Sequence, residues 1–171
     1  MDLLEAIHTR RSVRRFTDEP VTDEQLETLL RAAMAAPSAG NQQPWRFVIV
    51  RDADMRARLA EATPYSAPAG RAPLAIVVLG DTRNNKHPGY WVQDCSAAVE
   101  NLLLAVHAMG LGAVWMGVHP TEDRARAVAE IVGAPEDVVP LCMIAVGVPE
   151  GPGPEVDRYK PEFVHVEGWA E

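Results

Sequence analysis

The chain has 171 residues, and 47% of them are hydrophobic, which suits a single domain with an apolar core. Its 16 basic and 24 acidic residues give a net charge of −8, which argues against a nucleic-acid or anionic-membrane partner because both require a positive surface. The two cysteines, Cys95 and Cys142, are too few and too far apart for a disulfide scaffold or a thiolate zinc site, and they are expected to be buried free thiols.

Helices and strands are predicted to alternate along the chain. Apolar residues at helical spacing indicate a helix over residues 2–9, and a capping box from Thr22 to Gln25 begins a second helix that ends before Pro37. The later expected elements are a strand at 45–50, a helix at 52–62, a strand at 74–80, a helix at 90–109, a strand at 113–118, a helix at 121–132 and a strand at 139–147. Prolines and glycines within 64–73 indicate a broken connection. This order predicts a mixed β-sheet flanked by helices, of the α/β or α+β class.

Two segments of this single 1–171 domain indicate contact with another surface. The helix at 90–109 is apolar on almost every side, which is typical of a helix in a core or an interface. The extended segment 155–171 carries several apolar side chains and is expected to add a strand or to wrap a partner. The N-terminus has no apolar stretch that would indicate a secretory signal, and glycines interrupt the longest apolar run, at 102–118, so a cytoplasmic protein without a membrane span is expected.

Four of the 16 basic residues lie within residues 10–15, which read RRSVRR. Guanidinium groups bind phosphate oxygens in pairs, and the Ser12 hydroxyl would add a donor, so this arginine cluster could hold a small anion. If the segment is helical, Arg10 and Arg14 share one face. The alternative is pairing with Asp18 and Glu19 on a solvated surface, and the residues alone leave both interpretations open.

Two further segments have the composition of ligand-binding loops. Residues 37–44, PSAGNQQP, place amide and hydroxyl groups between two prolines, where they could bind the polar edge of a planar ring or form an ordinary helix-to-strand turn. Residues 110–117, GLGAVWMG, bracket an apolar strand with glycines, which indicates either close approach of a ligand or tight packing. Trp115 stands where a dinucleotide fingerprint would need its third glycine, and no paired histidines indicate a metal site.

Together these segments resemble the FMN-dependent nitroreductase family in its short, single-domain form. The similarity rests on IHTRRSVRRF at 7–16, APSAGNQQPWRF at 36–47 and NLLLAVHAMGLGAVWMG at 101–117, and the tail RYKPEFVHVEGW at 158–169 is also similar. Each motif alone is weak, but three in order at the family's spacing are specific. The resemblance covers nearly the whole chain.

The resemblance implies an α+β homodimer with a central mixed sheet, a C-terminal arm reaching the partner subunit, and two FMN sites at the subunit interface. It assigns Arg10, Arg11, Ser12 and Arg14 to the phosphate and ribityl chain, Pro37, Ser38, Asn41 and Gln43 to the ring from the other subunit, Val114, Trp115, Met116 and Gly117 to the ring lining, and Arg158 or Lys160 to a further phosphate contact. A main-chain N–H of Met116 or Gly117 would lie near flavin N5. His87, Tyr90 and Trp91 are expected in a lid over the pocket.

The implied activity is a ping-pong reaction in which NAD(P)H passes hydride to flavin N5 and a nitroaromatic, quinone or related conjugated acceptor then removes it. This scheme needs no catalytic side chain and no metal. Three alternatives remain. The chain could be a flavoenzyme of the same fold with different chemistry (flavin fragmentation, dehalogenation or substrate oxidation), a non-catalytic flavin-binding dimer, or an acidic interaction domain whose arginines are only surface charge.

Overall fold

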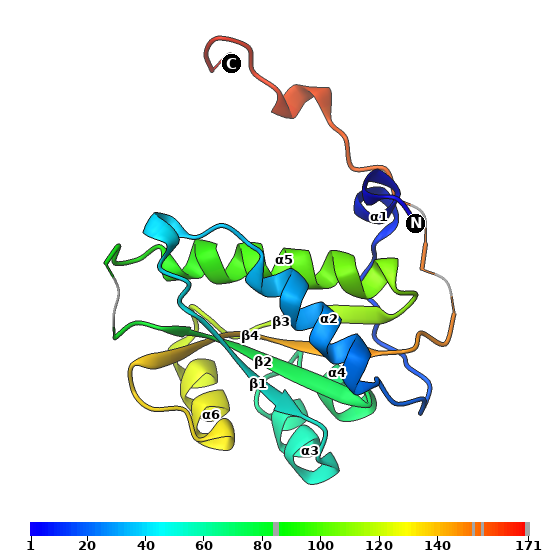
Figure 1. The fold of residues 1–171 in the computed structure, drawn as a ribbon, viewed down its shortest axis with the longest axis vertical. Helices are drawn as coiled ribbons and strands as arrows, with labels where there is room; N and C mark the ends of the chain where they lie inside the picture. The colour runs from blue at the N-terminus through cyan, green and yellow to red at the C-terminus, as the bar shows by residue number, and fades with distance from the viewer. Residues whose placement is uncertain (84–85, 152, 155, 170–171) are drawn as a thin grey trace.

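The centre of the molecule is a four-stranded sheet in the order β1-β2-β4-β3 (Figure 1). The computed structural model describes residues 1–83, 86–151, 153–154 and 156–169. The strands are β1 (Trp45–Val50), β2 (Leu74–Asp81), β3 (Gly112–Gly117) and β4 (Val138–Gly147). The fold is thus of the α+β class, with helices on both faces of the sheet.

All three neighbouring strand pairs are antiparallel, so the predicted mixed sheet is wrong for these strands. β1 and β2 are joined by two short helices that pack on each other, so the chain enters β2 from the end at which it left β1. β2 and β3 do run in the same direction, because both are antiparallel to β4. However, β4 fills the place between them, so no parallel pair forms.

The described residues form six α-helices, and they match the predicted ranges closely except for one short helix. They are α1 (Leu3–Thr9), α2 (Asp23–Met34), α3 (Ala53–Glu61), α4 (Ala67–Arg71), α5 (Trp91–Ala108) and α6 (Glu122–Val132). α2 and α5 cover one face, with α1 against α5, and the other three helices cover the opposite face (Figure 1). The predicted capping box is present: the Thr22 hydroxyl accepts from Gln25 N–H, and the Gln25 side chain accepts from Thr22 N–H. α4 lies where a broken connection was expected, and its Pro68 sits in the first turn, which helices tolerate.

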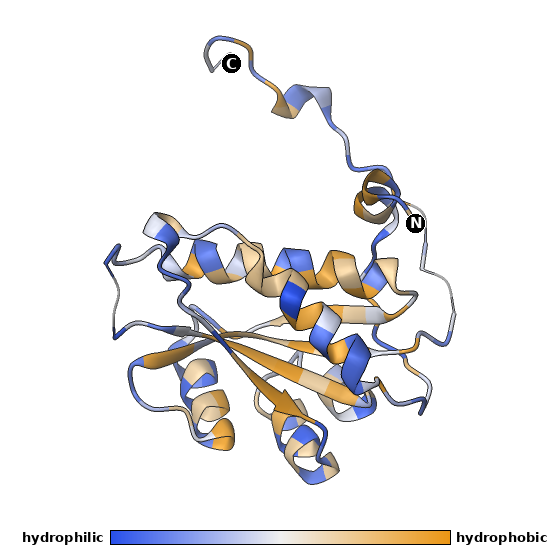
Figure 2. Cartoon of the chain, viewed as in Figure 1, coloured by the Kyte–Doolittle hydropathy of each residue, from blue (hydrophilic) through white to orange (hydrophobic). Residues whose placement is uncertain are grey.

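β2 is buried along its whole length because each face of the sheet has its own apolar core. Leu74, Ile76 and Val78 face the core under α5, whereas their neighbours along the strand face the core over α3 and α6. Figure 2 shows the strands as the most continuous hydrophobic part of the chain. The two cysteines are free and buried, as predicted, and burial raises the pKa of the Cys95 thiol to about 12. None of the helices in the described ranges combines the length and the apolar character that a membrane crossing needs.

The C-terminal segment 156–169 projects away from the body beyond α1 (Figure 1). Its regular structure is the 3₁₀ turn η2 (Pro161–Phe163). Phe163, Val166 and Trp169 are 71%, 80% and 83% exposed, so this segment leaves its own apolar side chains without cover from the body. Residues 155, 170 and 171 of the expected arm lie outside the described residues, and its contact with a partner subunit stays a prediction.

A buried carboxylate ties the end of β2 to its surroundings. Asp81, whose side chain is 4% exposed, accepts from Arg83 at 2.7 Å and pairs with Arg46 on β1 at 3.0 Å. The hydrogen bond from Arg83, with the nearby charge of Arg46, holds the pKa of Asp81 well below its ordinary value despite burial. Arg46 also donates to the Gln43 carbonyl, so this cluster anchors the end of the 37–44 loop.

We expect Asp81→Asn to lower the free energy of unfolding by about 2 kcal/mol at pH 7, because it removes the acceptor of two charged hydrogen bonds. The folded-state pKa of Asp81 is depressed, so its stabilisation is present above the ordinary pKa of 3.8 and is lost as the pH falls through the folded value. Urea denaturation should therefore show a difference between the variant and the wild type that shrinks below about pH 4. Asp54→Asn, an exposed carboxylate on α3, should change stability by less than about 0.5 kcal/mol.

Candidate functional site

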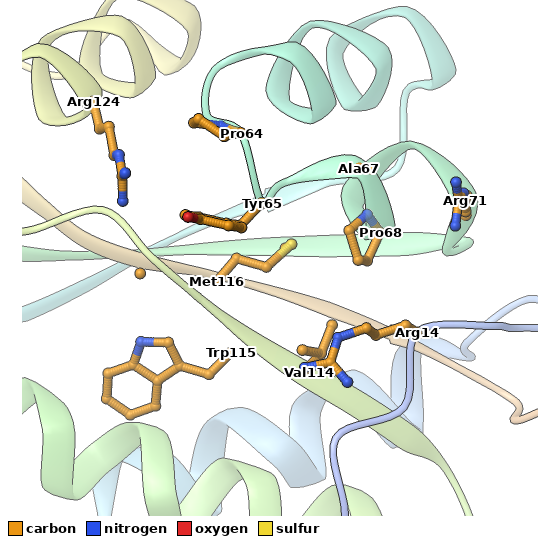
Figure 3. A pocket seen from close by; sticks show the side chains of 11 residues that line it. Arg14, Pro64, Tyr65, Ala67, Pro68, Arg71, Val114, Trp115, Met116 and Arg124 are labelled. Carbon is orange, nitrogen blue, oxygen red and sulfur yellow. The ribbon is translucent and has the colours of Figure 1, made fainter.

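A pocket of about 560 Å³ lies beside the edge strand β3, within the size range of cofactor and small-ligand sites (Figure 3). Its walls come from the arginine cluster, the loop that leads into α4, α4 itself, β3 and α6. The lining residues are Arg14, Pro64, Tyr65, Ala67, Pro68, Arg71, Val114, Trp115, Met116, Gly117 and Arg124. The structure therefore brings together Arg14 and the predicted β3 residues, and it adds a wall that the sequence did not reveal.

The pocket is positively charged although the protein is acidic. Arg14, Arg71 and Arg124 line it, and none of the lining residues is acidic. Within the described ranges no carboxylate lies at ion-pair distance from any of these three guanidinium groups. Arg124 instead lies over the Tyr65 ring, 5.4 Å from its centroid. Unpaired guanidinium groups gathered in one hollow fit an anionic ligand.

The arginine cluster reaches this pocket as an extended segment. α1 ends at Thr9, so the helical sharing of a face by Arg10 and Arg14 does not occur. Ser12 forms a parallel bridge with Ala113, and Val13 N–H donates to the Ala113 carbonyl at 2.8 Å. The chain therefore runs along the open edge of β3, and this contact places Arg14 at the pocket.

Gly112 allows this close approach. A Cβ atom at position 112 would lie 2.8 Å from the Val13 Cβ, closer than real side chains allow. The glycine at the start of β3 is thus explained by packing of the arginine segment on the strand.

The four residues predicted to hold phosphate have different surroundings. Arg10 pairs with Glu100 on α5 at 3.6 Å. Arg11 donates to four main-chain carbonyls, two of which, those of Pro154 and Val156, belong to the tail. Ser12 and Arg14 line a neighbouring hollow of about 380 Å³, and Arg14 is shared by the two pockets. Arg14 is therefore the arginine of this set that remains open to a ligand.

β3 offers both side chains and main-chain donors to the pocket. Met116 points toward Tyr65, while Trp115 lies on the opposite side of the strand (Figure 3). Val13 N–H binds the outward-facing Ala113 carbonyl, and Val118 N–H donates inward to Leu141. Because peptide groups alternate along an antiparallel strand, Gly117 N–H points to the open edge and Met116 N–H points toward β4.

The predicted ring-binding loop is held in a tight shape by its own side chains. The Ser38 hydroxyl accepts from Gln43 N–H at 3.0 Å, and the Gln43 amide donates to the Asn41 side chain at 3.1 Å. Asn41 and Gln43 have φ angles of 53° and 48°, in the left-handed region that asparagine tolerates but that costs a residue such as glutamine about 1 kcal/mol or more. Pro37 precedes this turn. Three of the four loop residues are therefore brought together.

One chain does not bring the loop and the pocket together. Ala39 N–H is bound to Asp94 near the start of α5, whereas Thr9, next to the arginine cluster, hydrogen-bonds His107 near its end. These anchors are 13 residues apart, which corresponds to roughly 20 Å along a helix. The start of the arginine cluster and the 37–44 loop thus lie near opposite ends of α5, and none of residues 37–44 lines the pocket.

The other predicted positions also lie outside the pocket lining. Arg158 and Lys160 are on the projecting tail, and the Lys160 ammonium lies 5.1 Å from the Phe163 ring centroid. Of the expected lid, Tyr90 is exposed and His87 contacts the 37–44 loop, but Trp91 is buried against His119, with ring centroids 4.9 Å apart. Trp91 is therefore a packing residue in one chain.

Sequence reasoning missed Tyr65, Arg71 and Arg124. α4 is five residues long, too short for a helical repeat to show, and Arg124 is one of several charges on α6. In the described part of the chain, no group of His, Cys, Asp and Glu side chains gathers in a way that could hold a metal ion.

Comparisons of the sequence and of the structure with known proteins point to one protein family. The family model described as "Nitroreductase family" matches residues 7–90 and 62–148. A protein of Methanothermobacter thermautotrophicus named "Putative NADH dehydrogenase/NAD(P)H nitroreductase" is 46% identical over 170 residues, which cover 99% of this chain and 88% of the relative. A solved structure of a protein with the same name from Parabacteroides distasonis is 42% identical, with a TM-score of 0.94 over 98% of both chains.

A solved structure from Desulfovibrio desulfuricans carries a flavin. It is described as a "putative nitroreductase in complex with fmn", is 35% identical and superposes with a TM-score of 0.84 over 99% of both chains.

Replacing Gly112 with alanine should push the arginine segment off β3. We expect Gly112→Ala to lower the free energy of unfolding by about 2 kcal/mol, because overpacking of this size has that cost. Val13→Ala in the same chain would remove the two clashing Cγ atoms of Val13, while its Cβ stays, and should restore part of the loss, which urea denaturation of the two variants can measure. Equal stability of the single and double variants would show that this contact does not position the segment.

Proposed function

The chain belongs to the nitroreductase family, and we propose that two copies of it form an FMN-dependent oxidoreductase that uses NAD(P)H to reduce nitroaromatic, quinone or related conjugated acceptors. The observation that carries this proposal is the pocket beside β3, with its three guanidinium groups, no acidic residue among its lining, and its open strand edge. The structure of the FMN-bound relative supports the choice of cofactor.

The residues of the pocket fit FMN chemically. Arg14 and Arg71, with the neighbouring Ser12, would hold the phosphate and the polar edge of the flavin, since guanidinium groups bind phosphate and carbonyl oxygens well. Met116 and Tyr65 supply apolar surface for a planar ring. Gly117 N–H, on the open edge of β3, is the main-chain donor that would bind the ring.

A second copy would complete the site. Residues 37–44 do not line the pocket of their own chain, so in the proposed dimer this loop approaches the flavin held by the partner. Leu3, Leu4 and Ile7 on α1 are exposed, and an apolar hollow between α1 and α5 is lined in part by Leu104 and Ala108. These surfaces, with the projecting tail, supply the apolar area that a homodimer interface needs.

Bound FMN would supply the capacity to take a hydride from NAD(P)H and to pass electrons to the acceptor. The protein's part is to bind and orient: the arginines stabilise negative charge, Gly117 N–H donates to the ring, and the loop covers it. Planar, electron-poor acceptors suit a slot with apolar walls. No side chain of this chain is assigned a proton-transfer role.

Arg14→Ala should weaken FMN binding about 30-fold, equivalent to about 2 kcal/mol, because it removes a charged hydrogen-bond donor from the pocket. Quenching of flavin fluorescence on titration measures the dissociation constant. Arg58→Ala, on the exposed last turn of α3, is the matched control and should leave the dissociation constant unchanged. An equal effect of the two variants would place the phosphate elsewhere.

Reduction by nicotinamide tests the activity directly. The FMN-loaded protein should lose its yellow colour when NADH or NADPH is added in the absence of oxygen. Later addition of a quinone or nitroaromatic should restore the colour, because the acceptor reoxidises the flavin. Failure of the wild-type protein to bind FMN contradicts the proposal. Bound FMN that neither nucleotide bleaches would instead favour a flavin-binding dimer or a different flavin chemistry.

A further inference from the structure

The 38–43 turn contains a residue in a conformation that its type does not favour. Gly40, Asn41 and Gln43 all have φ angles near 50°, which glycine adopts freely and asparagine tolerates, whereas Gln43 has a steric cost. Such a backbone persists only where its contacts hold it, and these include both the hydrogen bonds within the turn and the groups that contact it from outside.

Asp94 on α5 is the principal outside contact of this turn. It is 5% exposed, and its carboxylate accepts from Ala39 N–H at 2.9 Å and from the Gln42 side-chain amide at 2.7 Å. Among the described residues it has no ion-pair partner, so these loop donors are what the buried carboxylate binds. Hydrogen bonds to an ionised acceptor are roughly twice as strong as those between neutral groups.

Gln42 links Asp94 to a third segment of the chain, the one that contains His87. Its side-chain oxygen accepts from His87 N–H at 3.2 Å while its nitrogen donates to Asp94. The orientation of the amide is therefore set on both sides, with an acceptor required toward His87 and a donor toward Asp94. The His87 ring also covers Gly40, where an added Cβ atom would collide with the ring Nε2.

We propose that Asp94 and Gln42 are a positioning pair that holds the 38–43 turn and the segment at His87 in the shape needed to cover the flavin of the partner's site. The functional part of this inference rests on the proposed function. Neither residue touches the pocket, so the pair acts through Ser38, Asn41 and Gln43 and not on the reacting atoms.

Exchanging the carboxylate and the amide between positions 94 and 42 tests the proposed positioning pair. Asp94→Asn offers one acceptor where two donors arrive, so either Ala39 N–H or the Gln42 amide loses its partner. Gln42→Glu puts a second carboxylate beside Asp94, and the two repel. The double variant D94N/Q42E restores every contact: the new carboxylate accepts from His87 N–H and from the new amide at position 94, whose oxygen accepts from Ala39 N–H. It also keeps the net charge of the wild type.

Hydrogen–deuterium exchange of the full-length protein and FMN titration are the two measurements. We expect each single variant to speed amide exchange at Ala39, Gln43 and His87 about tenfold and to raise the FMN dissociation constant about tenfold, and the double variant to return both within about threefold of the wild type. Asp54→Asn, an exposed carboxylate on α3, should change neither. If Asp94→Asn does not fold, Gln42→Glu and the double variant give the same comparison.

The outcomes separate the two proposals. Unchanged exchange in the single variants, or a double variant no better than the singles, overturns the positioning pair. A merely structural Asp94 would lower the melting temperature and loosen α5 generally, without rescue confined to the turn. If the wild-type protein binds no FMN, the proposed function fails, while the exchange rates still decide whether the pair holds the turn.

Discussion

α5 is the constraint on which the organisation of this protein depends. One end of this helix binds the 38–43 turn through Asp94, and the other end binds the N-terminal segment through His107. Its middle is packed into the core under the sheet. This helix therefore separates the N-terminal segment from the 38–43 turn within one chain, and in the proposed dimer the turn would reach the partner's pocket. The exposed apolar surface of α1 is consistent with that dimer.

The edge position of β3 is the second condition for a site. An interior strand would have no free edge for either the arginine segment or a ligand. Here β4 occupies one edge, the arginine segment covers the start of the other, and the remainder opens into the pocket. The sheet thus supplies main-chain donors where the guanidinium groups supply charge. This arrangement also explains how a protein of net charge −8 can present a site for an anion.

Local features of the fold were predictable because short-range physics determines them. The capping box at Thr22, the glycine that ends α6 and the burial of β2 all follow from the residue types within a few positions. The direction of strand pairing could not be predicted from the sequence, because strands separated by helices can pair in either direction. It depends on the packing of α3 on α4, which returns the chain to the end of the sheet at which β1 finishes. α4 was missed because five residues show no periodicity.

The sequence by itself determined the order of the four strands and of every helix but α4, the three candidate motifs and the family they resemble, because these depend on residue type and spacing alone. Only the tertiary structure decided which arginine stays open to a ligand, since Glu100 and the tail carbonyls that engage Arg10 and Arg11 are remote in the chain. It also revealed the link between Asp94 and Gln42, which are 52 residues apart. Contacts of that kind form when the chain folds, and no local pattern records them.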